Sequence, residues 1–225
     1  GMPSFTLLGP NVLRLPFLVQ SSLPHELLHN WWGNGVYVDN SYGNWSESIT
    51  TYYSDHWIAE SQKQGDTYRR KALQNYLTYR AQGHDFPLKD FTERHNAITQ
   101  AVGYNKGLMV FKMLEYELGL KNGQPQLQNQ ILSLCLKDFY QNFKQQRASF
   151  KDLFLTCENT YDQMHGITNP NSELVSLQNF FHQWIETTNL PAFDIRIENT
   201  KAIAHGYAFD IQVTQTGDEM TYKIP

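Results

Sequence analysis

The segment HELLHNWWGN, residues 25–34, carries two histidines four residues apart, with a glutamate directly after the first. In an α-helix, residues four apart lie one above the other on the same face, so His25 and His29 can share one metal ion. Imidazole nitrogens bind Zn²⁺ at about 2.0–2.1 Å in a tetrahedral site. Glu26 lies one step further round the helix, where its carboxylate can reach a water molecule on the metal. These three residues predict a hydrolytic metal centre.

Two histidines leave such a centre incomplete, because hydrolytic zinc takes three protein ligands and keeps one position for water. Glu47 is the best candidate for the third ligand, since it comes early in a second predicted helix, behind a turn long enough to reverse the chain. Asp39, in the turn itself, and His56, roughly two to three helical turns after Glu47, are weaker candidates. The alternative interpretation is an ordinary amphipathic turn whose two histidines have Glu26 as a hydrogen-bond partner.

Helices must position these residues, and the sequence contains signals for several. A serine and an early proline in SSLPHELLHNWW predict a helix that begins near Ser22 and ends by Gly33 or Gly35. Residues 36–44 predict a strand edge and a turn. Apolar residues that recur at three- and four-residue steps predict further helices over residues 45–64, 66–82, 101–119, 126–146, 149–166 and 173–189.

The two ends of the chain have a different pattern. Residues 4–19 predict short extended pieces broken by Gly9, Pro10 and Pro16, and the alternation after Pro191 predicts strands. The fold class is therefore mainly α, in three parts. Residues 1–19 are expected to end a preceding β-region, residues 20–190 to form a helical domain, and residues 191–225 to begin a C-terminal β-unit. Because the opening GMPSFTLLGP resembles a cleavage scar and the chain stops inside a strand-like pattern, we expect a fragment of a longer protein.

The segments HELLHNWWGN and NWSESITTYYSD resemble the signature of the gluzincin aminopeptidases, the group of aminopeptidase N and leukotriene hydrolase. In that family H-E-x-x-H is followed by x-W-x-G-N and then by a glutamate ligand within W-x-x-E-G. The first part is kept here by Trp31 or Trp32, Gly33 and Asn34. Trp45 and Glu47 keep the second part with one residue fewer between them, and Ser48 replaces the usual glycine. The gap from His29 to Glu47 is one residue shorter than is common in the family. We expect this difference to change the shape of the loop and not the identity of the ligand, since no other carboxylate is close to the expected place.

Two further stretches agree with this resemblance. VGYNKGLMVFKML, residues 102–114, is similar to the family's Y-x-K-G stretch, which opens a long apolar helix. FFHQWIETTNLPAF, residues 180–193, is similar to the segment that closes the family's catalytic domain. The resemblance spans roughly residues 20–195, and it implies a thermolysin-like catalytic helical domain with a few β-strands before it and the start of a β-domain after it.

The resemblance also implies a function. It predicts a zinc-dependent, aminopeptidase-like metallopeptidase that acts on a peptide substrate and holds one Zn²⁺ with His25, His29 and Glu47. Glu26 would take a proton from water as general base. Tyr104, the tyrosine of the Y-x-K-G stretch, would donate a hydrogen bond to the tetrahedral oxyanion.

One family feature is missing. Aminopeptidases of this group carry G-x-M-E-N on an edge strand before the first histidine, and its glutamate binds the free α-amine of the substrate. No glutamate precedes Glu26 in this chain, so exopeptidase and endopeptidase action both stay open. A strand over residues 3–8 could still hold substrate backbone by β-addition. Two other hypotheses remain: a catalytically degenerate peptidase fold that binds peptides or proteins, and hydrolysis of a non-peptide ester or epoxide.

Composition restricts the remaining function classes. Apolar residues make up 40% and aromatic residues 14% of the chain, which allows a substantial core. The net charge of -4 gives no basic surface for nucleic acid. No run approaches the roughly 18 apolar residues of a membrane span. Cys135 and Cys157 lie in helical patterns and predict two buried free thiols. The compartment and the oligomeric state are not determined by the sequence.

Several other residues are expected to have ordinary structural roles. Lys106 is expected to lie along a helix surface, with its aliphatic stem covering apolar neighbours. Asn34 is expected to hold the end of a helix, and Tyr52 and Tyr53 are expected to pack in the core. The histidines without ligand-like spacing are His84, His95, His165, His182 and His205.

Overall fold

The computed structural model of the chain describes residues 5–14, 16, 18–20, 22–121, 128–165 and 177–216. The chain divides into two compact units, Gly1–Thr187 and Thr188–Pro225. It is 60% helix and 16% strand, so the mainly α fold predicted from the sequence is confirmed. No helix among the described residues is long and apolar enough to cross a membrane. The three-part division of the chain stays a prediction.

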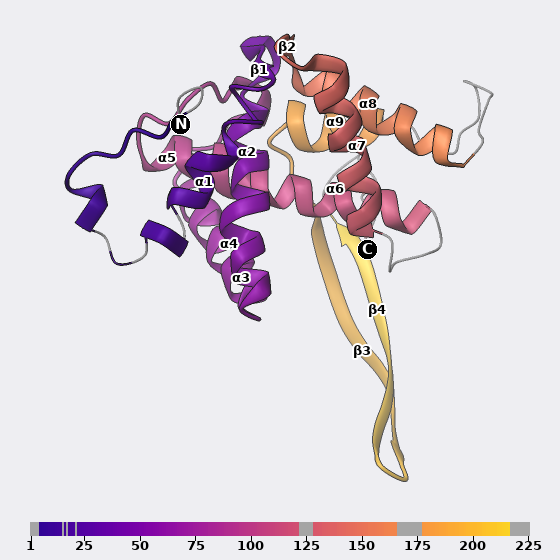
Figure 1. Cartoon of the computed structure of the whole chain (residues 1–225). Helices are drawn as coiled ribbons and strands as arrows, with labels where there is room; N and C mark the ends of the chain where they lie inside the picture. Colours follow the sequence, from indigo (N-terminus) through magenta and orange to yellow (C-terminus); the bar gives the residue numbers. More distant parts are fainter. Residues whose placement is uncertain are drawn as a thin grey trace. The chain divides into compact units, whose positions relative to one another are not determined.

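The first unit is a group of packed helices (Figure 1). Its α-helices are α1 (Ser22–Leu28), α2 (Trp45–Thr51), α3 (Trp57–Ser61), α4 (Gly65–Ala81), α5 (Ala97–Gln100), α6 (Gly107–Lys121), α7 (Gln128–Phe143), α8 (Phe150–Met164) and α9 (Gln178–Phe181). Three π-helical turns occupy Tyr52–His56, Ala101–Lys106 and His182–Glu186. Short 3-10 helices occupy Val12–Arg14, Leu18–Gln20, Asn40–Tyr42 and Leu88–Asp90.

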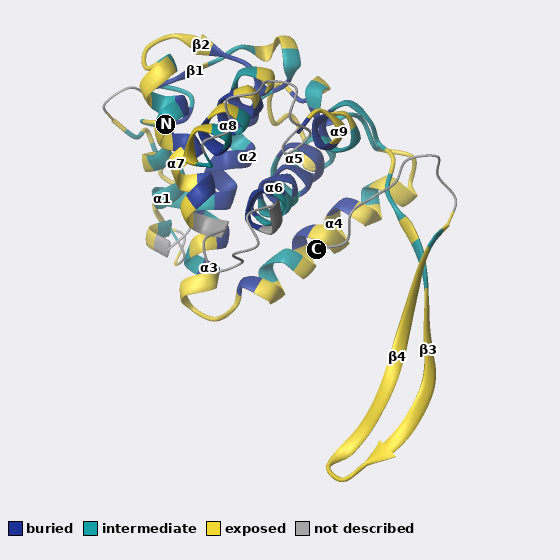
Figure 2. Cartoon of the chain, turned by 90° about the vertical axis from the view of Figure 1, so that its right-hand side faces the viewer, coloured by how far each residue is buried: buried dark blue, intermediate teal, exposed yellow. Residues whose placement is uncertain are grey.

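Aromatic side chains form the centre of this core, and α2 and α6 are its most buried helices (Figure 2). The ring of Trp45 lies 5.1 Å from that of Phe139 and 6.4 Å from that of Trp32, both with an edge toward a face. The indole N–H of Trp45 donates to the Ala148 carbonyl at 2.7 Å, so its one polar atom is satisfied inside the core. Trp45 thereby fixes the start of α2, the helix that carries Glu47.

A short connection turns the chain back from α1 to α2. Strand β1 (Tyr37–Val38) pairs in parallel with β2 (Arg147–Ala148), which ties this connection to the segment before α8. Asp39 then caps the following 3-10 turn, because its side chain accepts a hydrogen bond from the Ser41 N–H at 3.0 Å. Asn44 caps α2 through the Ser46 N–H, also at 3.0 Å. The predicted strand edge and turn over residues 36–44 are confirmed.

Helix α1 begins at Ser22 as predicted but ends at Leu28, earlier than Gly33 or Gly35. The main-chain N–H groups of Trp31 and Trp32 both donate to the Leu28 carbonyl, which closes the last turn. The chain then changes direction at Gly33, whose φ of 109° is readily adopted only by glycine. The prediction of extended pieces before α1 is wrong for residues 12–14 and 18–20. There the N–H groups of residues 12 and 13 bond back to the carbonyl of Gly9, which closes a turn instead of pairing with a strand.

Two of the predicted helices are interrupted by π-helical turns. The helix predicted over residues 45–64 contains the turn Tyr52–His56, and the helix predicted from residue 101 begins with the turn Ala101–Lys106. A π-turn contains one more residue than an α-turn, so it shifts the face on which the following side chains lie. Periodicity alone did not reveal either interruption.

The structure corrects the expectation for Lys106, which is buried and only 4% exposed. Its ammonium group donates to the Thr187 carbonyl at 3.2 Å and lies 5.7 Å from the centre of the Tyr76 ring. The reason is that the π-turn holding Lys106 packs against α4. Tyr52 is buried as expected, and Tyr53 is half-buried. Cys135 and Cys157 are confirmed as buried free thiols.

The second unit contains an antiparallel hairpin of β3 (Ala192–Ile203) and β4 (Gly206–Thr216). The predicted alternation is therefore confirmed over these strands. Pairs such as Ile195 with Val213 and Ile197 with Ile211 place large apolar side chains opposite each other, and all four are exposed. Residues 217–225 lie outside the described part of the chain, as do parts of the predicted helices 126–146, 149–166 and 173–189.

Candidate metal centre

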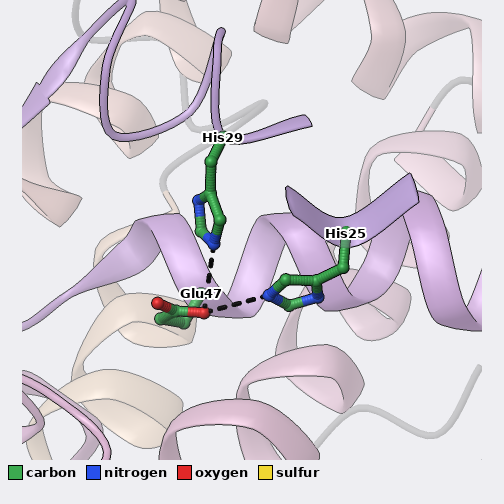
Figure 3. Close-up of side chains that lie close together, drawn as sticks. All are labelled: His25, His29 and Glu47. Atoms are coloured by element: carbon green, nitrogen blue, oxygen red, sulfur yellow. Dashed lines mark hydrogen bonds and ion pairs between the residues drawn. The ribbon is translucent and has the colours of Figure 1, made fainter. Parts of the chain in front are cut away.

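Two histidines and one glutamate converge at the junction of α1 and α2 (Figure 3). The Nε2 atom of His25 lies 3.2 Å from Oε2 of Glu47, and the Nε2 atom of His29 lies 3.5 Å from the same oxygen. Within the described residues these form the one group of three whose candidate ligand atoms all lie within 4.8 Å of one another. Both imidazoles therefore direct the same ring nitrogen toward a single carboxylate.

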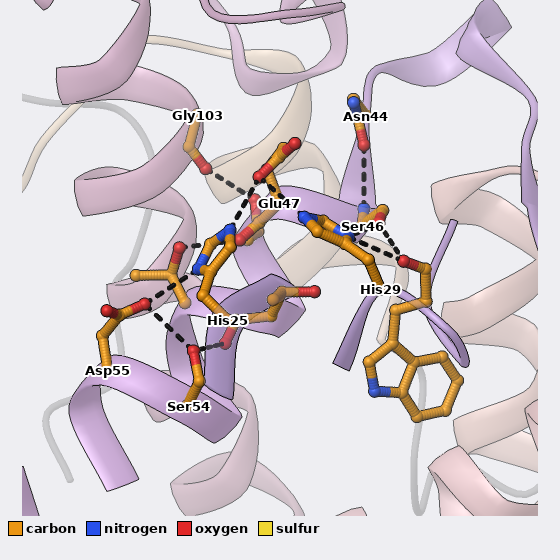
Figure 4. Close-up of polar contacts among 12 residues, drawn as sticks. His25, His29, Asn44, Ser46, Glu47, Ser54, Asp55 and Gly103 are labelled. Carbon is orange, nitrogen blue, oxygen red and sulfur yellow. Dashed lines mark hydrogen bonds and ion pairs between the residues drawn. The ribbon is translucent and has the colours of Figure 1, made fainter. Parts of the chain in front are cut away.

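The other nitrogen of each imidazole is held by an acceptor (Figure 4). His25 Nδ1 lies 2.9 Å from Oδ2 of Asp55, and His29 Nδ1 lies 2.9 Å from the carbonyl oxygen of Trp32. A carboxylate and a carbonyl can only accept, so each Nδ1 carries the hydrogen and donates it. When a metal ion replaces the proton on Nε2, the Nε2 lone pair of each neutral ring is directed at the centre, and a partner on Nδ1 is what orients a histidine ligand on a metal.

The surroundings of His29 are fixed by a serine next to Glu47. Ser46 donates its hydroxyl hydrogen to the Trp32 carbonyl at 2.6 Å, and its oxygen lies 3.3 Å from His29 Nδ1. Gly33 leaves the space for this contact, because a Cβ added there would lie 2.9 Å from the Ser46 hydroxyl. The start of α2 therefore positions both Glu47 and the partner of His29.

The protonation of His25 and that of Glu47 depend on each other. Burial disfavours the protonated form of His25, but the carboxylates of Asp55 and Glu47 outweigh it and raise the pKa of His25 to about 9. Burial likewise disfavours the Glu47 carboxylate, yet its hydrogen bonds to His25 and His29 hold the pKa of Glu47 well below its usual range. The centre thus favours a positive charge between these side chains.

The donor set fits a catalytic zinc ion. Two imidazoles and one carboxylate are a common set of three protein ligands, with the fourth position left for water or substrate. Both imidazoles have their second nitrogen occupied, and no rearrangement of the main chain is needed for the three ligand atoms to face one another. The residues present are therefore able to hold such an ion.

The ring of Tyr104 stacks on the ring of His25. Their rings are nearly parallel, with centroids 6.0 Å apart, and the edge of Phe91 meets the tyrosine ring at the same centroid distance. Burial, together with the Glu47 carboxylate, raises the pKa of Tyr104, so its hydroxyl stays protonated and can donate. The main chain beside it is tied to α2, because Ser48 donates to the Gly103 carbonyl at 2.8 Å.

A cavity of about 330 Å³ opens beside these groups. Glu26 and Tyr104 both line it, together with His25. The remaining lining residues are Ser22, Thr51, Asp55, Tyr68, Arg94, Gln100 and Asn105. Glu26 is therefore on the wall of a space next to the predicted metal ligands, where a general base must be able to reach water.

The two weaker candidates for the third ligand lie elsewhere. Asp39 caps the 3-10 turn after β1, and its carboxylate is not part of the cluster. His56 is buried against Tyr52, and its Nε2 pairs with Glu60 at 3.1 Å. The structure therefore brings Glu47, and neither of these two, to the histidine pair.

The sequence analysis missed Asp55 as a partner of the centre. Asp55 follows Glu47 by eight residues, and in a regular α-helix that spacing would rotate it about 80° away from the same face. The π-helical turn Tyr52–His56 adds the extra residue that restores the facing. The only signal in the sequence is an acidic residue eight positions after Glu47, one more than the seven that would place it on the same face of a regular α-helix.

Comparison with known proteins identifies the family. No match to the chain is found among curated proteins. The sequence does match the model of the Peptidase family M1 domain over residues 17–184, a range that includes α1, α2, the π-helical turns beside them and every lining residue of the cavity. Peptidases of this family are zinc-dependent, in agreement with the cluster of two histidines and a glutamate. The chain therefore belongs to peptidase family M1, the family of aminopeptidase N-like metallopeptidases.

Proposed function

We propose that this chain is the catalytic part of an aminopeptidase-like zinc metallopeptidase that holds one Zn²⁺ with His25, His29 and Glu47. The observation that carries the proposal is the convergence of both Nε2 atoms on a single oxygen of Glu47, with both Nδ1 atoms occupied by acceptors. Family membership supports the general class of metallopeptidase. When bound, the ion would lower the pKa of a water molecule toward about 7 and polarise the scissile carbonyl.

The chain's own residues supply the proton transfers and orientation. Glu26 lines the cavity one residue from His25, so its carboxylate can accept a proton from the attacking water and pass it to the leaving amine. The Tyr104 hydroxyl, kept protonated by its buried position, donates a hydrogen bond to the oxyanion of the tetrahedral carbon. Asp55 holds the His25 ring in the orientation that presents Nε2.

Metal content is the first test of the proposal. The purified chain is incubated with zinc salt, passed through a desalting column and measured by elemental analysis. We expect about one zinc per chain, and its absence would contradict the proposal. Aminoacyl fluorophores and blocked internal peptides are then offered as substrates. Hydrolysis of the first set alone indicates exopeptidase action, and hydrolysis of the second indicates endopeptidase action. Zinc binding without hydrolysis of either favours a degenerate, peptide-binding fold.

Two variants separate the base from a ligand. Glu26→Gln removes a proton acceptor but no ligand, so zinc content should stay at the wild-type value while kcat falls by about 10²–10⁴. Glu47→Ala should lose the metal, because only two ligands remain. Equal zinc loss in both variants, or unchanged turnover in Glu26→Gln, would be incompatible with these assignments.

A further inference from the structure

The cavity beside the metal centre is polar on every side that the structure describes. None of its lining residues is aliphatic, and its aromatic residues are tyrosines, which carry hydroxyl groups. A separate cavity of about 530 Å³ is lined by apolar residues such as Leu28, Trp31 and Trp57, and it shares no lining residue with the first. Selectivity at the described part of the site must therefore come from polar and charged groups.

Arg94 is the single lysine or arginine among the lining residues of this polar cavity. The fixed negative charges on the same wall belong to Glu26 and Asp55, and Asp55 is engaged by His25 and Ser54. A substrate group with negative charge would be repelled by these carboxylates unless a cation balanced them. Apart from the metal centre itself, the guanidinium of Arg94 is the cation that the described part of this wall provides.

Arg94 is also uncompensated. Within the described residues neither Arg94 nor Arg70 forms an ion pair, whereas Arg69 pairs with Glu60 and Asp66, Arg80 with Asp85, and Arg196 with Asp194. Arg94 is exposed in the segment before α5. It lines the same cavity as Tyr104 and Asn105, so its charge reaches this space. An exposed guanidinium offers two parallel N–H groups that match a carboxylate.

We infer that Arg94 binds a carboxylate of the substrate close to the scissile bond. The inference rests on the proposed peptidase function and adds a substrate class to it: peptides that carry a negative charge next to the bond to be cleaved. That carboxylate has two sources in peptides, an Asp or Glu side chain or the C-terminal carboxylate of a very short peptide. Arg94 acts here as a specificity residue and takes no part in the proton transfers.

The test compares carboxylates with isosteric amides on the zinc-loaded full chain. One arm uses peptides with Asp or Glu against Asn or Gln on either side of the scissile bond. The other arm uses dipeptides with a free C-terminus against the same dipeptides as C-terminal amides. We expect one arm to show a carboxylate preference in kcat/KM of roughly 10- to 100-fold, as for a hydrogen-bonded charge. The arm that shows it identifies the source of the carboxylate.

Arg94→Gln should abolish this preference, and Arg94→Lys should keep a part of it, because lysine retains the charge without the paired N–H groups. Arg70→Gln is the matched control, since Arg70 is exposed on α4 and lines neither this cavity nor the apolar one. It should leave the preference at the wild-type value. The preference should also shrink as ionic strength rises.

Three results would overturn the inference: no carboxylate preference in either arm, a preference that survives in Arg94→Gln, or an equal fall in kcat for charged and neutral substrates in that variant. If the zinc-loaded chain hydrolyses nothing, the same ligand pairs are compared by calorimetric binding. Binding selectivity that depends on Arg94 would then support the carboxylate site while the proposed peptidase activity fails. If the carboxylate ligands and their amide counterparts bind equally well, that result alone contradicts the inference.

Discussion

His25 and His29 differ in what holds their second ring nitrogen. A charged carboxylate, Asp55, accepts from His25, whereas a main-chain carbonyl accepts from His29. A carboxylate partner increases the electron donation of an imidazole to a bound metal and fixes its tautomer more strongly than a neutral carbonyl does. Because the partner of His25 Nδ1 is a side chain, its contribution to metal binding can be measured by substituting Asp55 alone.

Asp55→Asn keeps the size of this partner but removes its charge. We expect zinc affinity to fall by about 10- to 100-fold, because the weakened partner no longer stabilises the ligand orientation. Affinity is measured by competition with a chromophoric chelator. Asp66→Asn serves as the control, since Asp66 is exposed and pairs with Arg69. Equal affinities for the wild type and Asp55→Asn would contradict the role assigned to Asp55.

The buried ammonium of Lys106 predicts a pH dependence of stability. Burial lowers the pKa of Lys106 from 10.5 to about 8. Between those pH values the unfolded chain keeps the proton and the folded chain has lost it, so the contribution of Lys106 to stability rises with pH across this window. Below about pH 8 the buried charge costs the folded state up to about 3 kcal/mol.

Lys106→Met removes this titration. The free energy of unfolding of the variant and of the wild type is measured by urea denaturation at several pH values. The variant should exceed the wild type in stability by the largest amount near pH 7. This advantage should decrease as the pH rises from about 8 to about 10. A difference that is constant over the whole range would show that Lys106 does not titrate in that window.

At the scale of elements, two π-helical turns border the centre. The turn Tyr52–His56 carries Asp55 and the turn Ala101–Lys106 carries Tyr104. Each holds an extra residue, so each re-aims one side chain toward the histidine pair. Helix α2 links the two π-helical turns. It runs directly into the turn Tyr52–His56, and its Ser48 donates to the carbonyl of Gly103 in the turn Ala101–Lys106. Ser48 and Gly107 also fit closely, since a Cβ on Gly107 would lie 2.1 Å from the Ser48 hydroxyl.

Ser48→Ala tests this link between α2 and the turn that carries Tyr104. The change leaves the Gly103 carbonyl without its donor, so we expect the position of Tyr104 to loosen and kcat to fall by roughly 5- to 20-fold, within the range of a lost buried hydrogen bond. Zinc content should not change, because Ser48 does not contact the ligands' second nitrogens. The readouts are kcat, KM and metal content.

Ser61→Ala is the matched control for this change, because Ser61 is exposed at the end of α3 and its hydroxyl donates to the Ile58 carbonyl. A fall of kcat in Ser48→Ala together with loss of zinc would point to general unfolding. An unchanged kcat would remove Ser48 from the positioning of Tyr104.

At the scale of the whole molecule, every residue of the proposed site belongs to the first unit, Gly1–Thr187. The second unit contributes a hairpin whose large apolar side chains are mostly exposed. An isolated hairpin of this kind is only marginally stable in water. The stability of the metal centre should therefore depend on the packed helices and not on the hairpin.

Truncation after Thr187 tests this division and keeps the carbonyl that Lys106 contacts. We expect the shortened chain to keep its helical circular dichroism spectrum, to bind one zinc and to melt within a few degrees of the full chain. Loss of cooperative melting, or of zinc binding, would mean that residues beyond Thr187 are required for the first unit to fold. The same truncation should reduce the binding of apolar dyes, because it removes the exposed apolar pairs of the hairpin.

The sequence by itself determined the local part of this site. Helix geometry predicts that His25, Glu26 and His29 lie close together, although His29 lies one residue beyond the end of α1. Glu47 was found because a reversing turn precedes its helix. The mainly α fold and the strands after Pro191 followed from periodicities of 3.6 and 2 residues, whereas the pairing of those strands into a hairpin did not. These features are encoded within short segments, so neighbouring residues suffice to predict them.

Only the tertiary structure decided the partners of those residues. Asp55 faces His25 because a π-turn adds a residue, Ser48 reaches Gly103 across 55 positions, and Lys106 is buried because its turn packs against α4. Arg94 was not recognised either, since an arginine in an irregular segment has no periodic signal. Each of these contacts joins segments that are distant in the sequence, and its geometry depends on how whole helices pack, which no local pattern specifies.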